Sequence, residues 1–344
     1  MKNSLNFLSE QKNLNGRYTI KDKLGSGNSS EVFECLDNQT GELKAIKIYG
    51  DETRIIFRKE MKIMQKISEI NSSSHIKWYE GGIEFLSEER KSKKKMYAIL
   101  ELGNHGSLYE AVERTKNGFS EDVCKFLLLQ IIKAVDDLHK NGICHRDLKT
   151  ENMVLVGKNY DVKLCDFGFS TKFLKKNKQK KKLKNHLGTE YYMAPEIIED
   201  IEYDGDKIDI FSIGALLFVL MTKKFGFKEA KIYDKIEKKS QLLYELIKEK
   251  KYDQYWELLK AEFNIEINSE NFKKLYVRMV AYEPKERPTI EQIKNDAWMQ
   301  DIINASPEQL TFLRNKMITK LLIKVHQPNL FINMKRVYRI LFEL

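Results

Sequence analysis

The sequence predicts an α+β fold with two lobes, a small β-rich lobe that contains one helix and a larger, mainly helical lobe. From Tyr18 onward, short apolar segments typical of strands are separated by turn residues. Residues 57–67 carry apolar side chains at helical spacing and predict a single amphipathic helix. Long helical patterns then occupy residues 119–139 and most of residues 205–299.

Length and composition limit the number of domains and the class of protein. The chain has 344 residues, of which 42% are apolar and 32% charged, enough for one large or two modest domains with real cores. No apolar run is long enough to cross a bilayer, and residues 1–17 are interpreted as a mobile lead-in without a signal peptide. The four cysteines show no metal-binding spacing, which favours an intracellular location, cytoplasmic or nuclear.

The formal net charge of +10 is concentrated in two segments. Residues 172–184 contain eight lysines and no acid, and residues 302–344 carry seven Lys or Arg against two Glu. The rest of the chain has a small net negative charge. Any anionic partner should therefore meet these two segments, and we expect no nucleic-acid partner.

The central stretch, residues 144–155, lies between a helical pattern and a short strand pattern and holds three polar side chains. Asp147 can orient an attacking hydroxyl and accept its proton, Lys149 can neutralise a migrating phosphoryl group, and Asn152 can offer an oxygen to Mg²⁺. A second acid, Asp166, follows in the sequence D-F-G and is positioned to take metal as well. This set of residues predicts phosphoryl transfer.

The two motifs, H-R-D-x-K-x-x-N and D-F-G, resemble the catalytic and metal loops of eukaryotic protein kinases. The resemblance covers residues 18–299 and implies a kinase domain that transfers the γ-phosphoryl group of Mg-ATP to protein substrates. Lys149 and the sequence G-T-E-Y-Y-M-A-P-E at 188–196 favour a serine/threonine kinase, with a lean toward the calcium/calmodulin-dependent-like branch. The implied catalytic residues are Asp147, Lys149 and Asn152. The implied metal ligands are Asn152 and Asp166.

The nucleotide site is expected at the glycine-rich turn of residues 24–32. Its glycines let the backbone approach phosphates, although Ser30 stands where the kinase pattern has a third glycine. Lys47 resembles the strand lysine that grips the α- and β-phosphates, and Glu60 is implied as its ion-pair partner. The full set of residues implied to bind ATP is Leu24, Gly25, Gly27, Val32, Ala45, Lys47, Glu60, Glu101, Gly103, Val154 and Asp166.

The resemblance also assigns places around the adenine ring and the catalytic loop. Val32 and Ala45 would contact one face of the ring, and Val154 would contact the other. The Glu101 carbonyl and the Gly103 N–H would bond its edge. Further supporting contacts are implied for Thr189, bridging the catalytic base and lysine, for Asp209, holding the catalytic-loop backbone, and for a buried Glu196–Arg287 ion pair.

The segment that follows D-F-G departs from the family pattern. Arg146 is the cation that receives a phosphate from an activated loop in the family. The chain has no Ser, Thr or Tyr between Thr171 and Thr189, and Asn185 stands where many relatives carry the activating threonine. Two interpretations stay open. Either the loop is ordered without phosphorylation, on its own or by an anion that binds its lysines, or it is a long disordered loop with solvated lysines.

Residues 300–344 are expected to form a basic helical tail that is regulatory. One apolar face is predicted from the spacing of Phe312, Leu313, Met317, Leu321 and Leu322. Three interpretations stay open: the tail binds calmodulin, another regulator or a membrane surface, it docks on the kinase body as an autoinhibitory or bracing helix, or it begins a further domain.

The alternative to catalysis is an ATP-binding pseudokinase scaffold whose lysine-rich loop and tail bind anionic partners. Ser30 and the lysine-rich loop support it. Every catalytic acid, lysine and amide of the family motifs is present, however, and this favours the enzyme.

Overall fold

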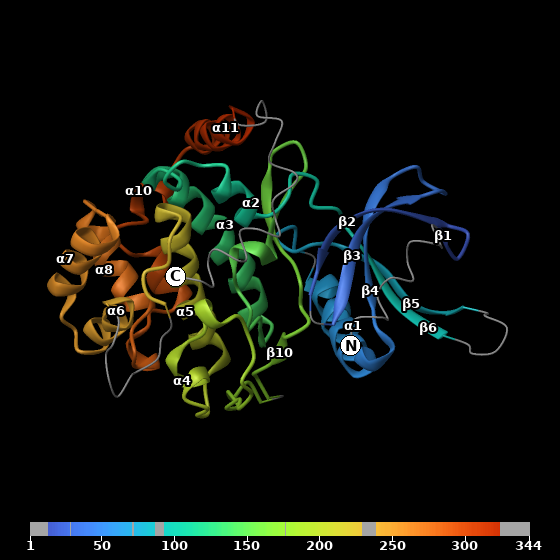
Figure 1. Cartoon of the computed structure of the whole chain (residues 1–344), viewed down its shortest axis with the longest axis horizontal. Helices are drawn as coiled ribbons and strands as arrows, with labels where there is room; N and C mark the ends of the chain where they lie inside the picture. The colour runs from blue at the N-terminus through green and yellow to red at the C-terminus, as the bar shows by residue number, and fades with distance from the viewer. Residues whose placement is uncertain are drawn as a thin grey trace.

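The structure is a computed structural model, and it describes residues 13–27, 29–70, 72–86, 93–175, 177–228 and 239–323. These residues form two lobes, a β-sheet with one helix at one end of the molecule and a mainly helical body at the other (Figure 1). The predicted fold class is therefore confirmed.

The smaller lobe is a six-stranded antiparallel sheet with the strand order β1-β2-β3-β4-β6-β5. Side chains of alternating residues face its two sides. Ile46 and Ile48 enter a core within the sheet, whereas Ala45, Lys47 and Tyr49 lie on the opposite face. The strands are β1 (Asn13–Leu14), β2 (Tyr18–Ser26), β3 (Ser30–Asp37), β4 (Leu43–Tyr49), β5 (Trp78–Leu86) and β6 (Lys93–Leu100).

Helix α1 (Arg54–Ile70) follows a short 3₁₀ turn, η2 (Asp51–Thr53), and confirms the helix predicted over residues 57–67. Its buried residues recur every three or four positions, so they form one stripe. Glu60 is the one acid in that stripe and is only 3% exposed. A buried carboxylate needs a partner, and the helix directs this one toward β4.

The larger lobe is built around α5 (Gly205–Thr222), which is apolar on all sides and buried along nearly all of its length. The other helices surround it: α2 (Leu108–Glu113), α3 (Glu121–Lys140), α4 (Pro195–Ile198), α6 (Lys239–Lys248), α7 (Tyr252–Phe263), α8 (Glu270–Met279), α9 (Ile290–Lys294), α10 (Gln300–Ile303) and α11 (Pro307–Ile323).

Two small antiparallel pairs of strands carry the loops of the site. The strands β8 (Met153–Val156) and β9 (Asp161–Leu164) form a hairpin, and β7 (Ile143–Cys144) pairs with β10 (Thr171–Lys172). Three 3₁₀ turns complete the lobe: η3 (Thr150–Asn152), η4 (Glu190–Tyr192) and η5 (Pro284–Glu286). Among the described residues, no helix is long and apolar enough to span a membrane.

The predicted lead-in over residues 1–17 is wrong for residues 13–17. Asn13 and Leu14 pair with β2, and the Leu14 side chain is buried in the core of the sheet. Arg17 forms an ion pair with the buried carboxylate of Asp37 at 3.0 Å. Residues 1–12 lie outside the described residues.

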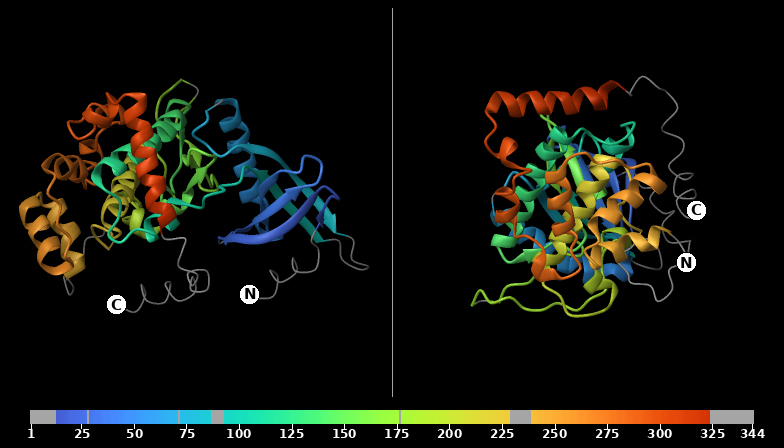
Figure 2. Two further views of the ribbon diagram at one scale, coloured as in Figure 1. Left: turned by 90° about the horizontal axis from the view of Figure 1, so that it is seen from above. Right: turned by 90° about the vertical axis from the view of Figure 1, so that its left-hand side faces the viewer.

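The C-terminal helix α11 lies along one side of the larger lobe, as both views in Figure 2 show, and packs on α3. Met317 and Leu321 are fully buried there. The predicted apolar face is partly wrong, because Phe312 and Leu322 are 66% and 52% exposed. The covered stripe contains the buried Met317 and Leu321 and the half-buried Leu310 and Leu313, since α3 covers the helix from that side.

Candidate active site

The loop between β7 and β8 is held in place by Asp209 of α5. Both carboxylate oxygens of this buried residue accept backbone hydrogen bonds, from His145 N and from Arg146 N, each at 2.9 Å. Arg146 has a φ of +70°, a conformation that costs energy for a residue other than glycine. The contact with Asp209 therefore holds a strained backbone just before Asp147, and the predicted role of Asp209 in holding this loop is confirmed.

Asp147, Lys149 and Thr189 converge at the end of this loop. The Thr189 hydroxyl donates to Asp147 Oδ1 at 2.7 Å and accepts from Lys149 Nζ at 2.7 Å. Lys149 Nζ also lies 3.1 Å from Asp147 Oδ2, and Asn152 Nδ2 donates to the same oxygen at 3.0 Å. The predicted Thr189 bridge is confirmed, and the carboxylate is held by three side chains.

Lys47 joins the two lobes through two carboxylates. Its Nζ donates to Glu60 Oε1 of α1 and to Asp166 Oδ1 of the D-F-G segment, each at 2.8 Å. Asp166 also has a positive φ, +59°, which turns its side chain toward the lysine. The predicted Lys47–Glu60 pair is therefore present, and the D-F-G acid is bound to the same ammonium group.

The charges of this triad stabilise one another. Burial alone would lower the pKa of Lys47, but Asp166 and Glu60 outweigh it and raise the pKa well above its usual value. Burial raises the pKa of Glu60, and the attraction of Lys47 opposes that shift. Burial also acts to raise the pKa of Asp166, yet its attraction to Lys47 lowers the pKa to about 2. Lys47 is thus charged and Asp166 ionised at neutral pH.

The face of the sheet that carries Lys47 forms one wall of the predicted nucleotide site. Cross-strand pairing places Val32 beside Lys47 and Leu100 beside Ala45, so these side chains share that face. At Gly25, no atom of the described residues lies within 4 Å of the position that a Cβ would take. The protein's own packing does not require glycine there, whereas close approach of a phosphate group does.

The opposite wall comes from β8. The segment after β6 passes so close to it that a Cβ on Gly103 would lie 2.8 Å from Val154 Cβ. Ser107 also pairs with Val154 in an isolated β-bridge. Gly103 and Val154, both predicted to contact adenine, are thus brought together by the fold. Leu24, at the rim of the glycine-rich turn, is 46% exposed.

We expect Gly103→Ala to lower the unfolding free energy of the nucleotide-free protein by about 1–3 kcal/mol, because the added methyl group overlaps the backbone-fixed Cβ of Val154. Urea denaturation measures this change. Gly25→Ala is the matched control, since its Cβ meets no described atom and should leave the stability near that of the wild type. Equal losses for both variants would contradict this account of Gly103.

The segment Glu101–His105 connects the lobes and is tied to the β8–β9 hairpin. The carboxylate of Glu101 accepts two hydrogen bonds from Lys163 Nζ of β9, at 2.7 and 2.8 Å. Asn104 Oδ1 accepts from Gly157 N at 2.9 Å, and His105 Nε2 lies 2.9 Å from the Gly157 carbonyl. Glu101 also exchanges two hydrogen bonds with the backbone of Lys77 next to β5, so the connection is held by both lobes at Glu101 and by the larger lobe at Asn104 and His105.

Asn152 and Asp166 are adjacent in space because Cys165 N donates to the Asn152 carbonyl at 2.9 Å. The described residues contain no cluster of three or more His, Cys, Asp or Glu that holds a metal by itself. One amide and one carboxylate oxygen suit Mg²⁺, which is usually bound by few protein oxygens together with substrate phosphates. The two residues fit the predicted metal on these grounds.

The lysine-rich segment is ordered in its described part. Leu174 and Lys180 pair in a β-bridge, so the segment forms a hairpin at the edge of the larger lobe (Figure 2). Lys180 pairs with Asp206 at 2.6 Å and Lys182 with Asp204 at 2.9 Å. The interpretation as a disordered loop is wrong for residues 172–175 and 177–188, but its second part is confirmed, because the described lysines of this segment are all exposed.

The predicted ion pair between Glu196 and Arg287 is confirmed. It is bidentate, with both N–O distances at 2.6 Å, and both side chains are buried. Arg287 also donates to the carbonyl of Ala281 at 2.9 Å. The pair fixes the end of the activation segment to the segment around η5.

Sequence reasoning missed two residues near the site, Lys163 and Tyr203. Lys163 alternates with buried residues in β9, and Tyr203 stands in an isolated β-bridge with Leu183 just before α5. Their partners lie far along the chain, so no local pattern marks either residue.

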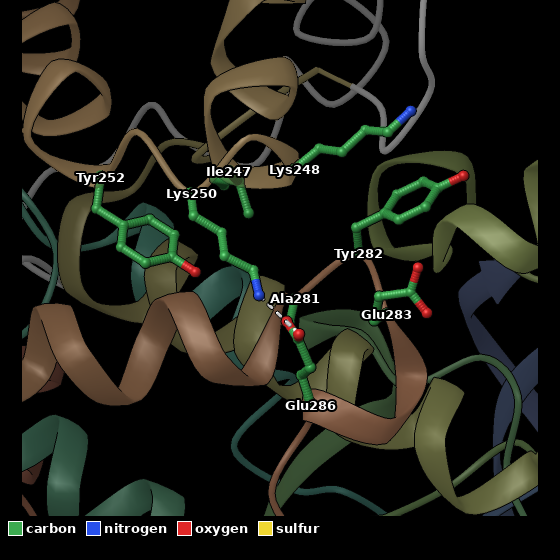
Figure 3. A pocket seen from close by; sticks show the side chains of 8 residues that line it. All are labelled: Ile247, Lys248, Lys250, Tyr252, Ala281, Tyr282, Glu283 and Glu286. Atoms are coloured by element: carbon green, nitrogen blue, oxygen red, sulfur yellow. Dashed lines mark hydrogen bonds and ion pairs between the residues drawn. The ribbon is translucent and has the colours of Figure 1, made fainter.

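A separate cavity of about 170 Å³ lies in the larger lobe between α6, α7 and η5, as Figure 3 shows. Lys250 and Glu286 form an ion pair of 2.7 Å beside it. None of the predicted site residues lines this cavity. Its lining residues are Ile247, Lys248, Lys250, Tyr252, Ala281, Tyr282, Glu283 and Glu286.

Comparison with known proteins agrees with the geometry. Residues 18–299 match the family model described as the protein kinase domain. The chain belongs to the protein kinase family. The resemblance to eukaryotic-type serine/threonine kinases is thereby confirmed.

Several relatives carry kinase names. The SNF-related serine/threonine-protein kinase of Homo sapiens is 32% identical over 288 residues, covering 83% of this chain and 34% of that protein. CBL-interacting protein kinase 26 of Oryza sativa subsp. japonica is 31% identical over 289 residues, covering 82% and 52%. CBL-interacting serine/threonine-protein kinase 9 of Arabidopsis thaliana is 32% identical over 286 residues, covering 83% and 58%. The chain thus spans about a third of the first relative and just over half of the other two.

Proposed function

We propose that this protein is a serine/threonine protein kinase that transfers the γ-phosphoryl group of Mg-ATP to Ser or Thr hydroxyls of protein substrates. One observation carries the proposal: the Asp147–Thr189–Lys149 cluster and the Lys47–Glu60–Asp166 triad are both assembled in one structure. The names of the relatives, which are serine/threonine-protein kinases, support Ser and Thr as the acceptor residues.

The triad would position the nucleotide. Lys47, held from two sides by carboxylates, would donate to the phosphates, and the backbone at Gly25 and Gly27 would approach them from above. Asn152 and Asp166 would hold Mg²⁺, which when bound neutralises charge on the phosphate oxygens. Val32 and Val154 would enclose the adenine ring.

Asp147 would serve as the base. A substrate hydroxyl that donates to this carboxylate passes its proton there as its oxygen bonds to the γ-phosphorus, and the bond to the leaving ADP oxygen breaks. Lys149, 3.1 Å from Asp147 Oδ2, places a positive charge where the transferred group gains negative charge. Thr189 hydrogen-bonds both side chains and so fixes their positions relative to one another.

The direct test is transfer of labelled phosphate from Mg-ATP to a generic basic protein, followed by identification of the labelled amino acids. Label on Ser and Thr is expected, and label on Tyr alone would refute the substrate class. A wild-type protein that ATP stabilises against heat but that transfers no label would favour the pseudokinase scaffold instead.

We further propose that α11 braces the larger lobe, the second of the three interpretations of the tail. Its apolar stripe is covered by α3, and two basic side chains add polar contacts there. Arg314 pairs with Asp161 at 3.2 Å, and Lys316 contacts Asp122. Capture of α11 by calmodulin would require this stripe to leave α3.

Met317→Ala is expected to lower the unfolding free energy by about 2–5 kcal/mol, because Met317 is fully buried between α11 and α3. Phe312→Ala removes a larger side chain that is 66% exposed and should change it by no more than about 0.5 kcal/mol. Denaturant unfolding compares the two variants. A larger loss for Phe312→Ala would show that the helix docks by the other face.

Two predictions remain as proposals. The first is a site for calmodulin or another regulator in the tail, residues 300–344, of which residues 324–344 lie outside the described residues. The intracellular location, cytoplasmic or nuclear, is supported by the four cysteines, all of which are free thiols.

A further inference from the structure

Arg146 is a buried cation in the middle of the catalytic region. It directly precedes the catalytic acid and is only 3% exposed. A buried guanidinium group requires hydrogen-bond partners, because its desolvation is otherwise costly. The lysine-rich segment offers no phosphorylatable residue between Thr171 and Thr189, so the partner must come from elsewhere.

The structure provides a neutral partner. Arg146 NH1 donates to the Tyr203 hydroxyl at 3.2 Å, and Arg146 Nε donates to the Phe169 carbonyl at 2.7 Å. The Tyr203 hydroxyl in turn donates to the Asn185 carbonyl at 2.9 Å. A phenol can accept and donate at once, so this one group joins Arg146 to the activation segment.

The backbone around Tyr203 holds the same segment. Tyr203 N donates to the Leu183 carbonyl at 2.8 Å, and Leu183 N donates to the Tyr203 carbonyl at 2.9 Å. The next residues, Asp204 and Asp206, pair with Lys182 and Lys180 as described above. Residues 203–206 are therefore a docking strip for the lysine-rich segment.

We propose that Tyr203 is a positioning residue that holds the activation segment in its catalytic arrangement without loop phosphorylation. The inference rests on the proposed kinase function. Asn185, the residue that Tyr203 holds, lies four positions before Thr189, and Arg146 is adjacent to Asp147. Tyr203 thus connects both sides of the Asp147–Thr189 hydrogen bond, which is 2.7 Å long.

The consequence is a kinase that is active as synthesised. The hydroxyl of Tyr203 accepts a hydrogen bond from the Arg146 guanidinium, the group that a loop phosphate would otherwise bind. Tyr203 as a residue is only 2% exposed, so its side chain is protected from competing water. Lys180 and Lys182, which would repel Arg146 if free, pair with Asp206 and Asp204, and these carboxylates offset part of the repulsion.

The test uses phosphatase-treated full-length protein whose lack of phosphate is checked by intact mass before and after the assay. The wild type should keep the kcat of untreated protein within about twofold. Tyr203→Phe should lower kcat by about 10- to 100-fold, the effect of losing a hydrogen bond to a charged group. KM for ATP should stay within about twofold, because the Lys47 triad is untouched.

Tyr255→Phe is the matched control. Tyr255 is also fully buried, and its hydroxyl contacts the Gly226 carbonyl at 3.1 Å and the Tyr276 hydroxyl at 3.2 Å, within the larger lobe. It should lose thermal stability comparably but keep its kcat. Amide hydrogen exchange adds a readout that needs no activity. Relative to the wild type, the amides of residues 177–188 should exchange faster in Tyr203→Phe and at the same rate in Tyr255→Phe.

Three results would overturn the inference. The first is a phosphate-free wild type that regains activity only when Ser170, Thr171 or Thr189 is phosphorylated, a result that leaves the kinase function intact. The second is an equal fall in kcat for both tyrosine variants, which would mean a merely structural role. The third is unchanged exchange of residues 177–188 in Tyr203→Phe. Absence of any transfer by every form of the wild type would instead refute the kinase function itself.

Discussion

Asp147→Asn is expected to lower kcat by about 10²- to 10⁴-fold, the usual contribution of a general base. The amide has nearly the same size and its oxygen can still accept the Thr189 hydrogen bond, but its NH2 group then faces the donors Lys149 Nζ and Asn152 Nδ2, so thermal unfolding of the variant is measured beside its rate. The amide cannot accept the proton of the substrate hydroxyl. Initial rates at saturating Mg-ATP measure the loss, while thermal stabilisation by ATP should be retained because Asp147 is not part of the Lys47 triad.

The control for this variant is Asp136→Asn. Asp136 is likewise a carboxylate held by two amino groups, Lys140 Nζ at 2.8 Å and Lys294 Nζ at 2.7 Å, but it lies on α3 away from the site. Its kcat should match that of the wild type. If Asp147→Asn kept more than about a tenth of the wild-type rate, Asp147 would not be the base.

Arg287→Ala is expected to lower the unfolding free energy by about 3–5 kcal/mol, the cost of leaving one half of a buried ion pair. Glu196 would keep its charge in a site from which water is excluded. The same substitution also removes hydrogen bonds to three backbone carbonyls, those of Ala281, Lys207 and Tyr282. Urea denaturation followed by far-UV circular dichroism measures the change.

Arg278→Ala is the matched comparison, because it removes an ion pair of similar geometry that is not buried. Arg278 NH1 also pairs with a carboxylate, that of Asp296 at 2.9 Å, but its side chain is 46% exposed. Solvent already stabilises both charges there, so the expected loss is about 0–1 kcal/mol. Similar losses at 278 and 287 would mean that the Glu196 pair contributes no more than a surface contact.

Much of the site follows from sequence because its chemistry is concentrated in short motifs. Asp147, Lys149 and Asn152 share one loop, and their mutual distances are limited by five residues of backbone. The pairing of Lys47 with Glu60 was predictable because one lies on a strand and the other on the one α-helix among the described residues of the small lobe.

The errors concern contacts between distant segments. The tail has apolar residues over a wide arc, and only the position of α3 decides that Met317 is covered and Phe312 is not. Tyr203 lies 57 residues from Arg146, and neither spacing nor polarity links them. Such choices depend on tertiary packing, which a local periodicity cannot represent.

The ties between the interlobe segment and the β8–β9 hairpin determine where the molecule can bend. Asn104 and His105 are fastened to the turn at Gly157 of the larger lobe, whereas Glu101 bonds both Lys163 of β9 and the backbone of Lys77 next to β5. Rotation of the lobes is therefore expected to centre on Glu101, with the strands of the sheet moving relative to β8 and β9. The adenine edge of a nucleotide would keep the same contacts with the larger lobe. The contacts between the small lobe and the phosphates would change as the lobes rotate.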